Sequence, residues 1–187
     1  MVRLSSCQKN IACLESFWTY DVENRLSMAP VLDLLGKTNG TRFVVLSCNT
    51  FQELEFNLEL IKKMRGYGIL YLGFHGFAGG IYLPDMKIKM EMLAQLMGKR
   101  FRNWIVFFDS CSTLRVQKDR VFDFMAQTGV AMVMGYRRDV EWVNGAAMDL
   151  LVLNRLHQYK SMGRFWTHFK KAYKDLVEMT GLEVFLK

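Results

Sequence analysis

A chain of 187 residues that is 51% hydrophobic and 23% charged is long enough to bury a core and too apolar to remain disordered. The formal net charge is +7, but the basic residues are scattered and no recognition motif accompanies them, so we expect no nucleic-acid binding. No apolar run approaches the roughly 18 residues that span a bilayer, so we expect no membrane partner.

The cysteine pattern gives no sign of a metal site. Cys7, Cys13, Cys48 and Cys111 form no Cys-x-x-Cys pair and have no histidine at zinc-site spacing. The stretch from residue 1 to residue 10 also lacks the apolar run of a signal peptide. We therefore expect reduced thiols in a cytoplasmic protein, with neither a metal nor another cofactor.

Hydrophobic patterning and turn signals predict alternating strands and helices in the first half of the chain. Thr50 and Glu53 have the spacing of a capping box, which opens a helix that runs to about Met64 with Leu54, Leu58 and Ile61, and also Leu60, as candidates for its inward face. The other expected elements are strands over 10–16, 43–46, 68–76 and 81–83, and a helix over 29–35 that Gly36 stops.

The second half of the chain continues the alternation. The expected elements are helices over 90–97, 119–127, 141–159 and 165–177, strands over 104–111 and 130–134, and a final edge strand over 182–186. Gly98 and Gly129 follow two of these helices as stop signals. Strands that alternate with helices predict an α/β fold with a mostly parallel sheet, which we expect to be a three-layer sandwich formed by residues 1–187 as a single domain.

Two of the predicted strands are apolar almost throughout and end in reactive residues. The first ends in His75-Gly76, and the second ends in Asp109-Ser110-Cys111. Ligand sites in parallel sheets lie at the carboxyl ends of the strands, so the imidazole of His75 and the thiol of Cys111 are expected to meet there. A catalytic cysteine needs a nearby base or cation to lower its pKa, and His75 is the candidate.

Three further side chains are candidates for the walls of this site. Side chains alternate along a strand, so Asp109 and Cys111 point the same way if the strand persists that far. Asp109 then either lines a substrate pocket that favours Lys or Arg, or serves as a local cap or turn residue. Trp142 and Tyr136 either wall the cleft or pack in the core.

These residues resemble a known family. A strand ending in His-Gly, followed by a strand ending in an acidic residue, a small residue and Cys, is similar to the caspase-like (clan CD) cysteine peptidases, and Asp109-Ser110-Cys111 is similar to the Asp-Ser-Cys of metacaspases. The compact form looks most like the bacterial CHAT-type branch, with Phe74-His75-Gly76, Ser110-Cys111-Ser112-Thr113-Leu114 and Gly135-Tyr136. The resemblance covers roughly residues 43–153.

The resemblance implies a caspase-like fold and a thiol protease, that is, a hydrolase cleaving peptide bonds in protein substrates. It implies His75 as general base or acid, Cys111 as nucleophile, Gly76 as oxyanion donor and Asp109 as the residue that recognises a basic side chain. The Gln-Ala-Cys-x-Gly signature of animal caspases is absent, which argues against aspartate specificity. Expected partners are a protein or peptide substrate and a regulatory protein.

Other functions are compatible with parts of the sequence. An α/β-hydrolase needs Gly-x-Ser-x-Gly at its nucleophile, and neither Ser110 nor Ser112 has flanking glycines. A phosphate-binding loop needs a Lys-Ser/Thr pair that residues 76–80 lack. The remaining alternative is a caspase-like scaffold or interaction module without catalytic activity.

Overall fold

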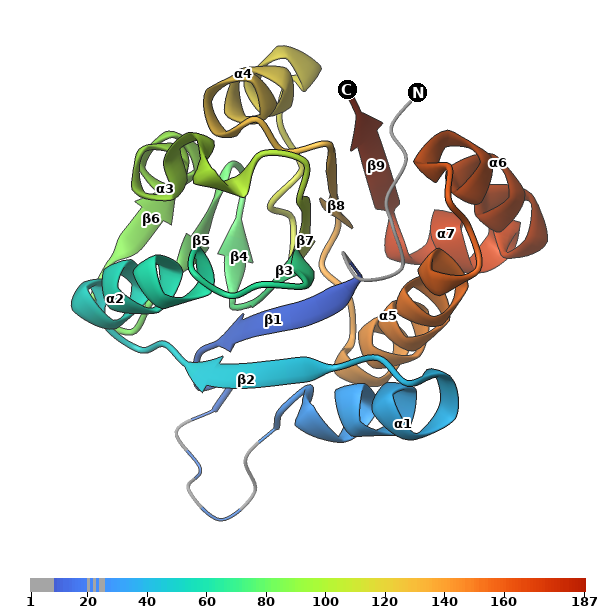
Figure 1. Ribbon diagram of the computed structural model, residues 1–187, viewed down its shortest axis with the longest axis horizontal. Helices are drawn as coiled ribbons and strands as arrows, with labels where there is room; N and C mark the ends of the chain where they lie inside the picture. The colour runs from blue at the N-terminus through green and yellow to red at the C-terminus, as the bar shows by residue number, and fades with distance from the viewer. Residues whose placement is uncertain (1–8, 20, 22, 24–25) are drawn as a thin grey trace.

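The computed structural model describes residues 9–19, 21, 23 and 26–187. Within these residues the chain forms a six-stranded sheet with helices on both faces, which is an α/β three-layer sandwich (Figure 1). The strands of this sheet are β1 (Asn10–Glu15), β2 (Phe43–Ser47), β3 (Tyr67–Gly73), β7 (Ile105–Asp109), β8 (Met132–Tyr136) and β9 (Leu182–Leu186). The expected fold class is confirmed.

The sheet order is β2-β1-β3-β7-β8-β9, and every pairing is parallel except the antiparallel pairing of β8 with β9. The first strand of the chain therefore lies inside the sheet, and β9 is the edge strand that the sequence predicted. A second, small antiparallel sheet was missed in part. It consists of β4 (Gly76–Phe77), β5 (Gly80–Tyr82) and β6 (Lys87–Lys89).

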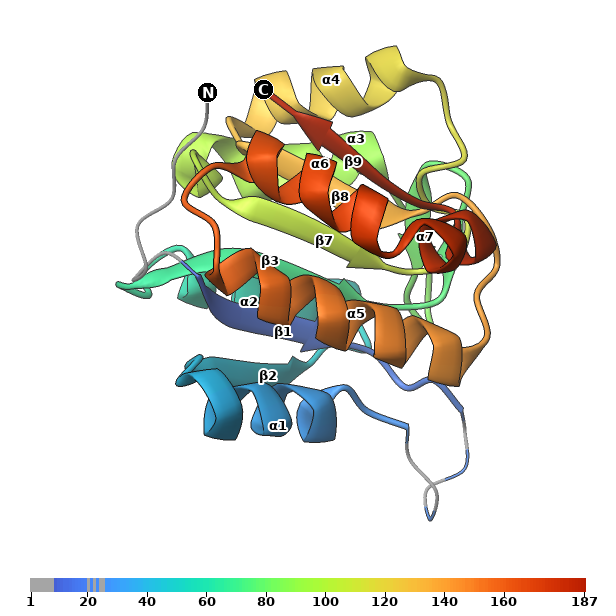
Figure 2. The ribbon, with the colours of Figure 1, turned by 90° about the vertical axis from the view of Figure 1, so that its right-hand side faces the viewer.

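Helices cover both faces of the main sheet. One face carries α2 (Phe51–Ile61), α3 (Met90–Met97) with the 3-10 helix η2 (Gly98–Phe101), and α4 (Lys118–Thr128). The other face carries α1 (Ala29–Asn39), α5 (Trp142–His157), α6 (Met162–Ala172) and α7 (Lys174–Thr180). In Figure 2 the second layer faces the viewer, with α5 and α6 in front of the strands.

The alternation of side chains along the strands divides the core between the two layers. On β3, Leu70 and Leu72 pack toward α2 and α3, whereas Ile69 and Tyr71 pack toward α5. Each of these side chains is fully buried, as expected for strands that are covered on both faces. The same alternation directs Asp109, at the end of β7, toward the α5 layer.

Several helix boundaries differ from the predicted ones. Helix α1 continues past Gly36 and ends at Gly40, which has φ of 73°. Gly36 is a close-packing position, because a Cβ there would lie 3.1 Å from the carbonyl oxygen of Thr41. The capping box at Thr50 is confirmed, but α2 ends at Ile61, and Leu60 is 40% exposed rather than inward.

The predicted helix over 165–177 is two helices. Tyr173 has φ of −123° and ψ of 38°, which breaks the helix between α6 and α7. Phe165 and Phe169 before the break and Val177 after it are all buried against the same core. The hydrophobic periodicity is therefore continuous although the helix is interrupted at Tyr173.

No helix among the described residues is both long enough and apolar enough to cross a membrane.

Candidate active site

The pairing of β3 with β7 sets the positions of His75 and Cys111. Gly73 pairs with Asp109 at the carboxyl end of both strands, so each candidate residue lies two positions beyond the same rung of the sheet. The two strands are short because the chain turns away after Gly73 and after Asp109. As predicted, His75 and Cys111 therefore follow neighbouring strand ends at the same edge.

Gly76 packs directly on the backbone of Cys111. A Cβ placed on Gly76 would lie 2.2 Å from the carbonyl oxygen of Cys111 and 2.9 Å from its nitrogen. Such an approach is open only to glycine. The backbone of Gly76 and the backbone N–H of Cys111 are thus neighbours, as a shared oxyanion site requires.

The two candidate catalytic side chains have other partners in this structure. Nε2 of the exposed His75 lies 3.0 Å from the carbonyl oxygen of Trp18. The Cys111 thiol lies 3.7 Å from the carbonyl oxygen of Val140 and accepts a hydrogen bond from the Val140 N–H at 3.4 Å. Burial raises the pKa of the Cys111 thiol, and the charges of Asp139 and Asp109 add to this effect. The lowered thiol pKa that nucleophilic catalysis needs is therefore not met in this arrangement.

Trp18, which the sequence did not single out, contacts His75 and lines the cavity beside Cys111. Its ring makes edge contacts with His75, at a centroid distance of 5.4 Å, and with Trp142, at 4.9 Å. Its Nε1 is buried without a hydrogen-bond partner among the described residues.

A cavity of about 30 Å³ lies beside Cys111, which is room for about one or two water molecules. It is closed by the strand ends, by the loop that carries Trp18 and by the first turns of α5. The lining residues are Trp18, Met28, Asp109, Ser110, Cys111, Tyr136, Val140, Glu141, Trp142, Gly145 and Ala146. Tyr136 and Trp142 thus wall the cavity, and both also pack in the core. Asp109 and Cys111 both line it although β7 ends at Asp109.

The floor of the cavity holds a buried pair of carboxyl groups. Asp109 forms hydrogen bonds with Tyr71 and with Asp149 of α5, and Asp149 also accepts hydrogen bonds from the hydroxyls of Tyr71 and Tyr136. Burial raises the pKa of Asp109 to about 6. Burial and the charge of Asp109 raise the pKa of Asp149 as well. Two adjacent buried carboxyl groups of this kind share a proton near neutral pH.

Sequence reasoning missed Asp149, although a signal for it was present. Asp149 lies three residues after Ala146 and four before Leu153, on the stripe of α5 that faces the core. A charged residue on such a stripe is almost never fully buried without a partner. Trp18 had no such signal, because it lies in a segment without periodicity.

The raised pKa of Asp109 makes a prediction about stability. A folded-state pKa of about 6, above the unfolded value of about 3.9, means that the folded protein binds more protons between these values. The contribution of Asp109 to the free energy of unfolding should therefore fall as the pH rises from about 4 to about 6. Asp109→Asn should remove this contribution and raise the free energy of unfolding at pH 7.5 by about 1–3 kcal/mol.

Urea unfolding at pH 4.5 and pH 7.5 measures this difference. Asp33→Asn is the matched control, because the ion pair of Asp33 with Lys37 is exposed and its loss should change stability by less than about 1 kcal/mol. If Asp109→Asn is no more stable than the wild type at pH 7.5, the pKa of Asp109 is not raised by burial beside Asp149 as described.

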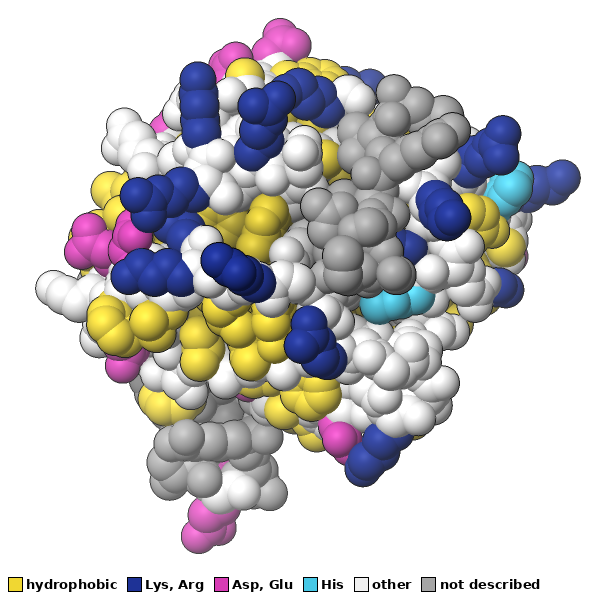
Figure 3. Space-filling model, in the orientation of Figure 1, with side chains coloured by type: hydrophobic (Ala, Val, Ile, Leu, Met, Phe, Trp, Pro, Cys, Tyr) yellow, Lys and Arg dark blue, Asp and Glu magenta, His cyan; other side chains and the backbone are white. Residues whose placement is uncertain are grey.

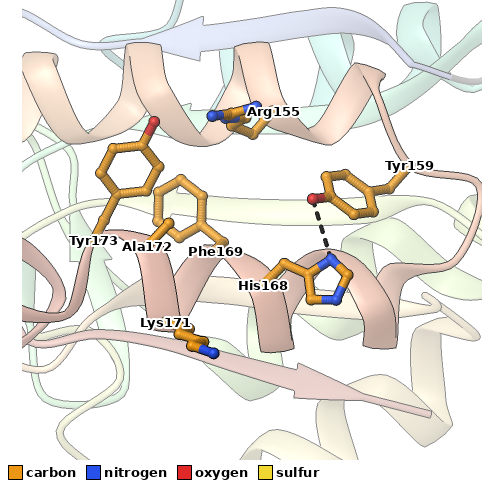
Figure 4. A pocket seen from close by; sticks show the side chains of 7 residues that line it. All are labelled: Arg155, Tyr159, His168, Phe169, Lys171, Ala172 and Tyr173. Atoms are coloured by element: carbon orange, nitrogen blue, oxygen red, sulfur yellow. Dashed lines mark hydrogen bonds between the residues drawn. The ribbon is translucent and has the colours of Figure 1, made fainter.

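A larger pocket of about 460 Å³ lies elsewhere, between α5 and α6 (Figure 4). Arg155 from α5 lies opposite His168 and Phe169 from α6, and the Nδ1 of His168 is 3.3 Å from the hydroxyl of Tyr159. Arg155, Tyr159, His168, Phe169, Lys171, Ala172 and Tyr173 line this pocket. None of these is a thiol, an aliphatic hydroxyl or a carboxylate, so the pocket has no candidate nucleophile comparable with Cys111.

The basic residues form several separate groups on the face shown in Figure 3. The free cysteines of the described residues are Cys13 and Cys48, which are buried, and the partly exposed Cys111. Cys7 lies outside the described residues.

Comparison with known proteins identifies the family of the chain. No curated protein matches the sequence. The model of a family of unknown function, DUF6642, matches residues 8–185, which is nearly the whole chain. The chain therefore belongs to the DUF6642 family.

Proposed function

We propose that this protein is a cysteine endopeptidase of caspase-like type that uses His75 and Cys111 as a dyad. The observation that carries the proposal is the pairing of Gly73 with Asp109, which gives both residues equivalent positions beyond adjacent strand ends. The contact between Gly76 and the backbone of Cys111 supports an oxyanion site at the same place.

The proposed reaction has two steps. His75 takes the proton of the Cys111 thiol, and Sγ attacks the carbonyl carbon of the peptide while the N–H groups of Gly76 and Cys111 stabilise the oxyanion. The C–N bond breaks, the proton passes from His75 to the leaving amine, and a thioester remains on Cys111. Water, activated by His75, hydrolyses the thioester and restores the thiol.

This chemistry requires a change from the arrangement described above. His75 must release the carbonyl of Trp18, and the cavity must enlarge, since about 30 Å³ does not hold an amino-acid side chain. The ring of Trp18, which packs against His75 and Trp142, obstructs this enlargement, and we call it the gate. The proposed enzyme is therefore latent in this conformation.

The buried carboxyl pair supports a preference for Lys or Arg before the scissile bond. Asp109 lines the cavity beside Cys111, and Asp149 lies against it. An ammonium or guanidinium group brought into the enlarged cavity favours the ionised form of both acids, which offsets the cost of their burial. The substrate class that fits is a protein segment with an exposed basic residue.

Three observations favour a second candidate function, a caspase-like scaffold or interaction module without activity. The Cys111 thiol is held by Val140, its pKa is raised, and His75 bonds elsewhere. In this alternative the closed site is the functional state and a regulatory protein is the partner. The free thiols at Cys13, Cys48 and Cys111 support a cytoplasmic location for either function.

A peptide library with Lys, Arg or Asp before the scissile bond tests the proposal. Cleavage by the wild type should follow Lys or Arg, and Cys111→Ala and His75→Ala should each lower the rate at least about a thousandfold. His168→Ala is the control for His75, because His168 is also exposed but lies on α6. Cleavage that survives Cys111→Ala would refute the dyad, and cleavage after Asp would refute the role of Asp109.

If the wild type cleaves none of the peptides, it is either a latent enzyme or a scaffold. Alkylation with iodoacetamide distinguishes these two explanations. Cys111 should react much faster than Cys7, Cys13 and Cys48, and His75→Ala should slow its reaction, when it belongs to a latent enzyme with a functional base. A Cys111 rate that His75→Ala leaves unchanged would instead favour the scaffold.

A further inference from the structure

Strand β9 leaves one side of its backbone without a strand partner among the described residues. It is the last strand of the sheet and pairs only with β8. The Arg137 N–H donates to Gly181 and the Lys187 N–H donates to Ala131, at 3.0 and 3.1 Å. Because hydrogen-bonded pairs alternate along an antiparallel ladder, the backbone groups of Glu183 and Phe185 bond to β8.

The alternate residues of β9 therefore turn their N–H and C=O groups outward. These residues are Leu182, Val184 and Leu186. An unpaired row of this kind is a template for an added strand. The sequence Leu-Glu-Val-Phe-Leu also carries a single charge, at Glu183, so it has little of the charge that protects edge strands.

A groove of about 1220 Å³ runs along this edge. Figure 2 shows β9 between α4 and α6, and the groove is lined by Phe122 of α4, by Trp166 and Lys170 of α6, and by residues of β9 itself. Phe122 is 46% exposed and makes an edge contact with Phe185, which gives the groove an apolar floor. Its volume is large enough for an extended peptide segment.

The walls of the groove have an excess of positive charge. Five basic residues line the groove against three carboxylates. Glu183 pairs with Arg137 at 3.0 Å, Glu178 pairs with Lys174 at 3.9 Å, and Asp139 accepts a hydrogen bond from the hydroxyl of Ser112. The other basic residues that line the groove have no carboxylate within ion-pair distance among the described residues. These are Arg115, Lys118, Arg138 and Lys170.

We propose that β9 and its basic groove bind an extended acidic segment of a partner protein, which adds to the sheet as a further strand. The main chain of the segment bonds to the outward groups of Leu182, Val184 and Leu186, and its carboxylates face Arg115, Lys118, Arg138 and Lys170. A second copy of the chain fits less well as the partner, because its own basic groove would face the basic groove of the first copy. The site is separate from the Cys111 chemistry and exists whether or not the dyad is active.

The experiment uses the full chain with Cys111→Ala, so that cleavage plays no part. The probe is a fluorescein-labelled octapeptide of alternating Glu and Val, and a peptide of alternating Lys and Val is its control. Fluorescence anisotropy should show binding of the acidic peptide alone, and the affinity should fall as NaCl rises from 50 to 300 mM. Hydrogen exchange should slow at the amides of Leu182, Val184 and Leu186 when the peptide binds.

Two variants test the two halves of the proposal. Val184→Pro removes an outward donor while leaving the bonds to β8, and it should weaken binding about tenfold. The double variant Arg115→Gln/Lys118→Gln should weaken binding about five- to tenfold at 50 mM NaCl. Its control is Lys99→Gln/Arg100→Gln, which removes the same charge from the exposed η2 and should leave the affinity unchanged. Circular dichroism and urea unfolding check that each variant is folded.

Three results would overturn the proposal. These are equal binding of both peptides, unchanged affinity in a folded Val184→Pro variant, and a dimer in solution that Val184→Pro dissociates. The last result would assign the edge to a second copy of the chain. None of them bears on peptide cleavage by His75 and Cys111, so the two proposals fail separately.

Discussion

Replacing Gly76 with alanine should lower the free energy of unfolding by about 3 kcal/mol or more and disrupt the candidate active site. The new Cβ would lie 2.2 Å from the carbonyl oxygen of Cys111 and 2.6 Å from the Oγ1 of Thr113. The first of these is a backbone atom, which cannot rotate away as a side chain can. Thr113 is also fixed, because its hydroxyl donates to the carbonyl of Gly80. The strand ends must therefore separate to admit one methyl group.

Urea unfolding of the two proteins measures this effect, and Gly163→Ala is its matched control. Gly163 lies in α6, and a Cβ added to it would have nothing within 4 Å, so alanine there should stabilise the helix by about 0.5–1 kcal/mol. Both substitutions add one methyl group, but they should change the free energy of unfolding in opposite directions. A Gly76→Ala protein as stable as the wild type would mean that Gly76 does not pack on Cys111 as described.

Trp18→Ala should raise the rate at which iodoacetamide alkylates Cys111 by about tenfold, because two aromatic contacts that hold the site closed are worth roughly 0.5–1.5 kcal/mol each. These contacts join the indole to His75 and to Trp142. The indole gives up little in leaving, since its buried Nε1 has no hydrogen-bond partner among the described residues. The loss of the ring opens the path to the thiol and removes the ring contact with His75, whereas the backbone carbonyl of residue 18 that bonds Nε2 of His75 stays in place.

Mass spectrometry of the labelled peptides gives the rate for each cysteine in one experiment. Cys13 and Cys48 are buried and serve as internal controls, because a general loosening of the fold would raise their rates as well. Val143→Ala removes an exposed side chain beside Trp142 and should leave the Cys111 rate unchanged. If Trp18→Ala left the Cys111 rate at its wild-type value, Trp18 would not be a gate. Under the proposed function the same variant also cleaves peptides faster than the wild type.

The sequence predicted the fold where local pattern and tertiary packing agree. Examples are the apolar strands β3 and β7 and the capping box at Thr50. Both features are recognisable from a few residues that are adjacent in the sequence. Gly36 misled the prediction of α1, since a glycine that ends a helix and a glycine that admits a close neighbour are identical in sequence. The break at Tyr173 was invisible for a similar reason, because the apolar stripe continues on both sides of it.

The candidate site was predictable only in part. His75 and Cys111 follow strands that pair in the sheet, so the rule for strand ends was enough to bring them to one edge. The partners that now hold them come from elsewhere in the chain: Trp18 from the segment after β1 and Val140 from the segment before α5. Contacts of this kind depend on how loops close over the sheet, which periodicity does not encode.

The strand order also has a consequence for how the molecule is made on the ribosome. After β1 and β2, every later strand of the main sheet joins on one side, in the order β3, β7, β8 and β9. The sheet can therefore extend outward as the chain emerges, with each new strand meeting a neighbour that is already synthesised. The residues of α5 that line the cavity beside Cys111, among them Trp142 and Ala146, emerge after both His75 and Cys111. During synthesis the thiol and the imidazole are thus present before the α5 wall of the cavity, whereas Trp18 is synthesised before both of them.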